Sequence, residues 1–242
     1  MLSPVPIWSL RLYITSRCNL RCTYCSVSQP YWVHADMAGD VIDQAVSELA
    51  DISSKDCVVH LNGHGETTFV DGWEIVAGSL LSQGSTLAMT TNLAKTYTDE
   101  EITILSRFKS INVSVDTFDD VLLKDVRRKV RATTIRSNID AIRECAIRHG
   151  NEPPIIQFSC GLFDKNTMSI GDYANEAIAL KVNDVTFWNL YKHPDLPDAD
   201  ELIDRMKNVA DAIQVLRANK VGVHVAGDFV NVLLDRCGLP RA

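Results

Sequence analysis

The chain has 242 residues, of which 23% are charged and 46% hydrophobic, a composition that excludes disordered, collagen-like and coiled-coil proteins. It carries 24 basic and 31 acidic residues, a net charge of −7, which argues against general nucleic-acid binding because duplex binders need a basic face. No apolar run approaches the roughly 20 residues that cross a bilayer, and no secretory signal pattern opens the chain. We therefore expect a cytoplasmic protein without a membrane partner.

Apolar, β-branched runs alternate with amphipathic stretches along the chain, which predicts repeated strand–helix units. Thr98, followed by Glu101, is typical of a capping box at a helix start, and Gly150 of a left-handed helix stop. The basic segment after residue 116 is expected to be irregular. The expected strands are 9–15, 57–62, 85–92, 111–116, 155–163, 184–190 and 221–225, and the expected helices are 39–53, 73–81, 98–108, 133–148, 173–180 and 201–218.

Six such units predict an α/β fold of parallel strands joined by right-handed crossover helices. Because six units are two short of a closed eightfold barrel, we expect an open, partial (β/α)6 TIM-like barrel. The barrel should occupy residues 1–225 and leave a tail at 226–242. Reactive groups should then lie at the carboxyl ends of the strands.

Three of the seven cysteines, Cys18, Cys22 and Cys25, gather in the run CNLRCTYC directly after the first expected strand. An odd cysteine count argues against a disulfide framework and for a reducing compartment. A structural zinc site usually has four ligands, whereas three thiolates suit an iron–sulfur cluster with one iron left open. A zinc-stapled binding module and a non-catalytic iron–sulfur electron carrier stay open as alternatives.

The run CNLRCTYC resembles the signature of the radical SAM enzymes. The resemblance implies that Cys18, Cys22 and Cys25 hold a [4Fe–4S] cluster whose remaining iron is chelated by S-adenosylmethionine. It implies reductive cleavage of this cofactor to a 5′-deoxyadenosyl radical, which abstracts hydrogen from a peptide or small-molecule substrate. It further implies that Tyr24 lies near the adenine, and that a reducing partner such as flavodoxin or ferredoxin supplies electrons.

Two further matches follow the next two expected strands. Residues 62–66, NGHGE, resemble the family's GGE motif, which meets the methionyl ammonium through its backbone and acid, here Gly63, Gly65 and Glu66. His64 stands where the motif usually has its first glycine, a position where a side chain is tolerable in the left-handed conformation. Asn92, in the run TTN, is similar to a family residue that faces the cofactor.

The fourth expected strand ends in Ser114-Val115-Asp116, which looks like the family's SxD motif. By resemblance Ser114 reaches the methionyl carboxylate and Asp116 the substrate side. The resemblance also implies an arginine directed at the cofactor carboxylate, here Arg128 with Arg127 as the alternative. A guanidinium suits this role because it binds a carboxylate bidentately. The residues expected to line the ribose and adenine are Ser159, Asn166 and Asn189.

Cys237 lies beyond the last expected strand. In family members of the SPASM or twitch type, a cysteine here opens the ligand set of an auxiliary iron–sulfur cluster. We expect that role for Cys237 only if the chain extends further. The fold does not choose the substrate.

Overall fold

The computed structural model describes residues 7–52, 57–189, 199–226, 231–232, 234–235 and 237–239. The strands are β1 (Ser9–Arg11), β2 (Val58–His60), β3 (Thr86–Thr91), β4 (Ser110–Ser114), β5 (Ile155–Leu162), β6 (Asp184–Asn189) and β7 (Gly222–Ala226). The α-helices are α1 (Gly39–Ile52), α2 (Trp73–Ser82), α3 (Asp99–Leu105), α4 (Asp120–Val126), α5 (Ala132–Arg148), α6 (Asp164–Thr167), α7 (Ile170–Ala179) and α8 (Ala199–Ala218). Two short 3₁₀ helices are η1 (Ser26–Ser28) and η2 (Thr67–Phe69).

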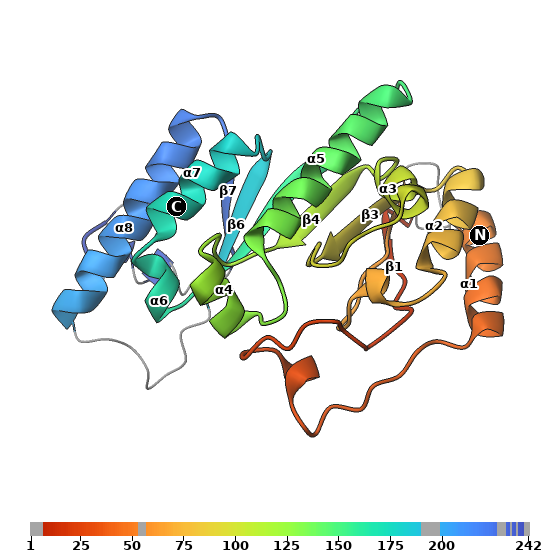
Figure 1. Cartoon of the computed structure of the whole chain (residues 1–242), viewed down its shortest axis with the longest axis horizontal. Coiled ribbons are helices and arrows are strands. Elements are labelled where there is room, and N and C mark those ends of the chain that lie inside the picture. Colours follow the sequence, from red (N-terminus) through yellow and green to blue (C-terminus); the bar gives the residue numbers. More distant parts are fainter. Residues whose placement is uncertain are drawn as a thin grey trace, which may run out of the picture.

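The strands form one parallel sheet in the order β1-β2-β3-β4-β5-β6-β7. Since each strand lies beside the next one in sequence, every crossover moves in the same direction, as in a barrel. In the described residues β1 and β7 lie at opposite edges of the sheet, so the barrel is open. The expected partial α/β barrel is confirmed, with β7 following six strand–helix units (Figure 1).

Alternate residues of the strands face the helices and form the core. Val59, Leu87, Ile111, Phe158 and Phe187 have no exposed surface, and they belong to one hydrophobic cluster with residues of the surrounding helices. Burying side chains of this size stabilises the fold by about 1.5–3 kcal/mol each. The opposite face of the sheet, here called the inner face, carries the other alternate residues and is partly accessible.

Two expected segments are corrected by the structure. The strand expected at 9–15 ends at Arg11, and the Leu12 N–H makes one further bond to the His60 oxygen before the chain turns away into the cysteine loop. Thr15 forms only an isolated bridge with Asp36. The segment expected to be irregular contains α4, whose start is capped by the Asp119 carboxylate accepting from two backbone N–H groups. The capping box at Thr98 is confirmed.

The carboxyl ends of the strands meet at the lower edge of the sheet in Figure 1, where the loop from β1 to α1 also passes. This convergence brings the turns after β2, β3, β4 and β5 to one place. None of the helices described here is long and apolar enough to span a membrane.

Candidate active site

The three clustered cysteines lie on the loop between β1 and α1. All three are free thiols; Cys22 is buried, while Cys18 and Cys25 are partly buried. The backbone N–H of Leu20 and the side-chain amide of Asn92 point at Cys18 Sγ, at 3.4 and 3.8 Å. Burial raises the pKa of Cys18 to about 12, and the negative charges of the other two thiolates add to the shift.

These thiols fit an iron–sulfur cluster by their chemistry. Thiolates are the usual ligands of such clusters, and N–H groups directed at the sulfurs are typical of their surroundings. A bound cation would also favour the thiolate form that burial disfavours. Over the described ranges, no three His, Cys, Asp or Glu side chains are gathered into a ready-made site for a metal ion. The fit thus rests on ligand type and on the shared loop.

Gly65, in the turn after β2, allows the cysteine loop to pass close by. A Cβ atom at this position would lie 2.2 Å from the carbonyl oxygen of Arg17. The neighbouring N–H of Glu66 donates to that same oxygen at 2.7 Å. Any side chain at position 65 would therefore push the cysteine loop away from β2.

His64 occupies the place of the missing glycine without backbone strain. It does not adopt the left-handed conformation, so the conformation considered for it from the sequence is not needed. Its exposed ring lies near the rings of Tyr13 and Trp32, with centroids 6.0 and 5.3 Å away. Gly63 packs against the same tyrosine, since a Cβ there would lie 2.3 Å from Tyr13 Cδ1.

The Glu66 carboxylate is buried and accepts four hydrogen bonds. The donors are the N–H and hydroxyl of Thr68 (3.3 and 2.9 Å), the hydroxyl of Thr91 (2.8 Å) and the N–H of Asn92 (2.7 Å). Burial nevertheless raises the pKa of Glu66. Both oxygens are directed at protein donors rather than at an open surface, so the side chain ties the turn after β2 to the end of β3.

Asp116 joins the cysteine loop to β4, α4 and β5, an arrangement we call the Asp116 clamp. Its carboxylate accepts from the Arg127 guanidinium at 2.7 and 3.1 Å, from the Tyr24 hydroxyl at 2.8 Å and from the Gly161 N–H at 2.9 Å. Asp116 has no exposed surface, so it is enclosed rather than facing a substrate. Burial also raises the pKa of Tyr24.

The two arginines considered for the cofactor carboxylate lie in different surroundings. Arg127 is buried in the clamp, whereas Arg128 is exposed with a φ of 53°. Arg128 lines, together with Cys22, a surface pocket of about 280 Å³. Adjacent arginines at a helix end cannot be told apart by sequence, because the turn geometry decides which one faces inward.

The remaining expected residues occupy different surroundings. Ser114 lies on the inner face at the end of β4, opposite Ser159 of β5. Asn166 is buried and donates to the backbone oxygens of Asp116 and Gly161, which supports the clamp. Asn189 ends β6, and its side chain lies outside the described residues.

Thr68 and Gly161 were not anticipated. They hold Glu66 and Asp116 through a hydroxyl and a backbone N–H, and such contacts leave no pattern in a single sequence.

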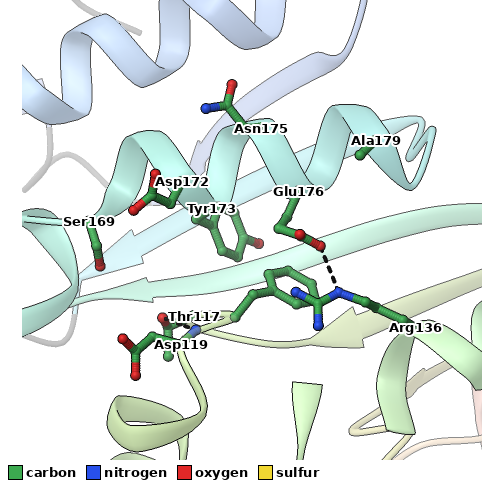
Figure 2. A pocket seen from close by; sticks show the side chains of 10 residues that line it. Thr117, Asp119, Arg136, Ser169, Asp172, Tyr173, Asn175, Glu176 and Ala179 are labelled. Carbon is green, nitrogen blue, oxygen red and sulfur yellow. Dashed lines mark hydrogen bonds and ion pairs between the residues drawn. The ribbon is translucent and has the colours of Figure 1, made fainter. Parts of the chain in front are cut away.

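A pocket of about 480 Å³ opens between α5 and α7 (Figure 2). Arg136 lies on its wall and pairs with Glu176 at 2.8 Å, while its guanidinium stacks on Phe118. The residues that line it include Asp119 and Asp172 but no cysteine. Because no cysteine lines this pocket, it does not share the chemistry of the cysteine loop. Its arginine is already paired with Glu176.

Comparison with known proteins decides the family. Residues 12–177 match the model of the Radical SAM superfamily, a span that contains the cysteine loop and the Asp116 clamp. The chain belongs to the radical SAM superfamily. It is accordingly a radical SAM enzyme, related in sequence and fold to other enzymes. The resemblance noted in CNLRCTYC is confirmed.

Among sequence relatives, GTP 3′,8-cyclase of Staphylococcus aureus (strain Mu3 / ATCC 700698) is 29% identical over 150 residues, covering 56% of this chain and 42% of the cyclase. Streptococcus suis SuiB bound to precursor peptide SuiA superposes with a TM-score of 0.70 at 15% identity, over 95% of this chain and 52% of SuiB. Native anSMEcpe with bound AdoMet and Cp18Cys peptide superposes with a TM-score of 0.67 at 16% identity, over 90% of this chain and 63% of anSMEcpe.

The chain therefore spans between 42% and 63% of the lengths of these three proteins. At these identities the structural neighbours establish the radical SAM fold.

Proposed function

We propose that this radical SAM enzyme binds a [4Fe–4S] cluster through Cys18, Cys22 and Cys25 and S-adenosylmethionine at the open iron, and that it abstracts hydrogen from a peptide or small-molecule substrate. When bound, these groups supply a 5′-deoxyadenosyl radical by reductive cleavage of the cofactor. The observation that carries the proposal is the link at Asn92, whose side chain donates toward Cys18 while its N–H donates to Glu66. One residue thus connects the cysteine loop to the GGE-like turn.

The chain's own residues would hold this site in shape. The Asp116 clamp fixes Tyr24 of the cysteine loop, for which the resemblance implies an adenine contact. Ser114 makes no side-chain hydrogen bond with the described residues, so its hydroxyl is free for the cofactor carboxylate. The Arg127 charge is already neutralised by Asp116, and we assign it to positioning the loop.

The substrate class and the tail stay proposals. SuiB and anSMEcpe carry peptides in their structures, while the cyclase is named for GTP, which supports keeping both peptides and small molecules as substrate classes.

We propose a core of residues 1–225 and a tail at 226–242. Cys237 is partly buried against the core, and its N–H donates to the Leu234 carbonyl oxygen; its auxiliary-cluster role stays a prediction.

For the reducing partner, we propose an acidic electron carrier such as flavodoxin or ferredoxin. It would dock on what we call the basic corner: Arg21, Lys124, Arg128, Lys129 and Arg131, all exposed. Two pockets of about 370 and 280 Å³ are lined by these side chains; Asp120 also lines the larger one, and Cys22 lines the smaller one. On a chain with a net charge of −7, such a corner favours an acidic partner next to a proposed cluster ligand.

The test compares two cysteine variants after anaerobic reconstitution. Cys22→Ala should lose most of its iron and sulfide and form no 5′-deoxyadenosine, because it removes a proposed ligand. Cys145→Ala, at a buried cysteine on α5, should keep both. Iron, sulfide and 5′-deoxyadenosine are measured together.

The alternatives predict other results. Zinc without iron would identify a zinc-stapled module, and iron without cofactor cleavage would identify an electron carrier. If Cys22→Ala kept its iron and its cofactor cleavage, the ligand assignment would be wrong.

A further inference from the structure

The inner face of the sheet carries two adjacent rows of polar residues, which we call the polar rows. Strand register places the members of each row side by side across neighbouring strands. The first row is Thr90, Asn112, Gln157, Asp184 and Gly222, and the second row is Ser114, Ser159, Thr186 and His224. All are partly or fully accessible. The interior of a closed barrel is normally packed with branched aliphatic side chains, so this face is suited to contact with a polar molecule.

Most hydrogen-bonding groups in the polar rows are not used by the protein. The side chains of Thr90, Asn112, Ser114, Ser159 and Thr186 form no hydrogen bond with any residue the structure describes. The Oδ1 atom of Asn112 is enclosed and still lacks a partner there. Buried polar groups in folded proteins are normally paired. A hydrogen-bonding ligand on this face would pair them.

Asp184 gives the polar rows their charge. One of its carboxylate oxygens accepts from the Gln157 amide at 3.2 Å, and the other lies 3.5 Å from Nε2 of His224. The carboxylate rests against the bare backbone of Gly222, where a Cβ would lie 2.0 Å from Asp184 Oδ1. Glycine at this position therefore leaves room for the carboxylate on the inner face.

We infer that the polar rows bind a polar substrate that carries an amino group, with Asp184 opposite that group and the Asn112 amide and row hydroxyls on its neighbouring polar atoms. The inference rests on the proposed function, which needs a substrate on the inner face, and it adds the substrate's chemistry. Asp184 is the first residue of β6, so the amino group would lie at the amino end of that strand. The rest of the substrate would extend across the second row toward Ser114, the last residue of β4. A hydrocarbon ligand would leave the polar side chains of the rows without hydrogen-bond partners. A polyphosphate would be repelled by the negative charge of the Asp184 carboxylate. An amino group could belong to a peptide side chain or to a free amino compound.

The experiment titrates the isotope-labelled full chain and follows the side-chain amide NMR signals of Asn112 and Gln157. The probes are two matched pairs: glucosamine against N-acetylglucosamine, and acetyl-Gly-Lys-Gly-amide against its norleucine analogue. GTP is the anionic probe. We expect at least one amine to shift these signals and to bind about tenfold more tightly than its amine-free partner, as a charge-assisted hydrogen bond predicts.

Two variants of different kind test the role of Asp184. Asp184→Asn keeps the shape and removes the charge, and Gly222→Ala displaces the carboxylate by its added Cβ. Each should abolish the roughly tenfold preference for the amine. Thr86→Val, an isosteric change on the inner face outside the polar rows, should leave the preference intact. Dispersed spectra establish that each variant is folded.

Binding of the peptide, of the sugar, or of both supports the inference and names the source of the amino group. The inference is overturned if no amine is preferred, if GTP binds more tightly than the amines as judged by the same signals, or if either folded variant keeps the wild-type preference. No step requires iron or S-adenosylmethionine. Loss of cofactor cleavage with amine preference intact would therefore overturn the proposed function alone.

Discussion

Glu66 illustrates how one buried acid can serve structure inside a motif associated with a cofactor. Four donors converge on its carboxylate from the turn after β2 and the end of β3. These hydrogen bonds favour the ionised form, but burial opposes it more strongly, and the pKa is raised. The folded protein therefore holds the proton of Glu66 more tightly than the unfolded chain does.

This balance predicts a pH-dependent contribution to stability. Because the folded pKa lies above the ordinary value of 4.5, the contribution of Glu66 is fully present below that value and is lost as the pH rises through the folded pKa. Glu66→Gln cannot titrate. The free energy of unfolding of the wild type, minus that of Glu66→Gln, should thus fall from pH 4.5 toward neutral pH.

Urea unfolding at several pH values measures this difference. Glu144→Gln, at an exposed position of α5, is the control. Its free energy of unfolding should differ from that of the wild type by nearly the same amount at every pH. A difference for Glu66→Gln that does not change with pH would show that burial of this acid is not thermodynamically costly.

At the scale of elements, the Asp116 clamp connects the cysteine loop to β4, α4 and β5. Its ion pair is almost fully buried, with side-chain exposures of 5% for Arg127 and 0% for Asp116. Removing one partner of such a pair leaves an uncompensated buried charge, which costs about 3–5 kcal/mol. We therefore expect Asp116→Asn to lower the free energy of unfolding by that amount.

Chemical denaturation followed by circular dichroism checks this expectation. The matched control is Asp125→Asn, whose aspartate pairs with Lys165 at the surface, both more than 60% exposed. Exposed pairs contribute about 0–1 kcal/mol, so this variant should unfold nearly as the wild type does. Equal losses in the two variants would mean that the clamp does not stabilise the loop.

The sequence predicts those elements whose signals are local. Thr98 and Glu101 form the capping box they indicate, and Gly150 takes the left-handed stop with a φ of 72°. α4 was missed because its seven residues carry too short an apolar pattern, and its cap at Asp119 is a single side chain. Helices this short depend on tertiary packing.

The candidate site was predictable where a motif carries it and not where geometry does. The cysteine run and Glu66 lie at the strand ends as expected. The choice between Arg127 and Arg128 depended on a turn in which Arg128 and Lys129 both adopt positive φ values. Neither residue is glycine, so no sequence signal marks that turn.

Over the whole molecule, charge is unevenly distributed. The chain is acidic overall, yet the basic corner gathers exposed cations beside the cysteine loop. Long-range attraction between opposite charges accelerates association and weakens with salt. An acidic electron carrier would thus be steered to the corner whose smaller pocket is lined by Cys22.

Reversing two charges of the basic corner tests this steering. Lys124→Glu/Lys129→Glu should slow flavodoxin-driven formation of 5′-deoxyadenosine by about tenfold at low ionic strength, and the deficit should shrink as salt is added. The rate with dithionite, which needs no docking, should be unchanged. The control, Lys181→Glu/Lys220→Glu, alters two exposed lysines before β6 and β7, both with positive φ like Lys129. Because the change in charge is the same in both pairs, a deficit confined to the first pair locates the docking surface, whereas equal slowing with dithionite would place the defect in the site itself.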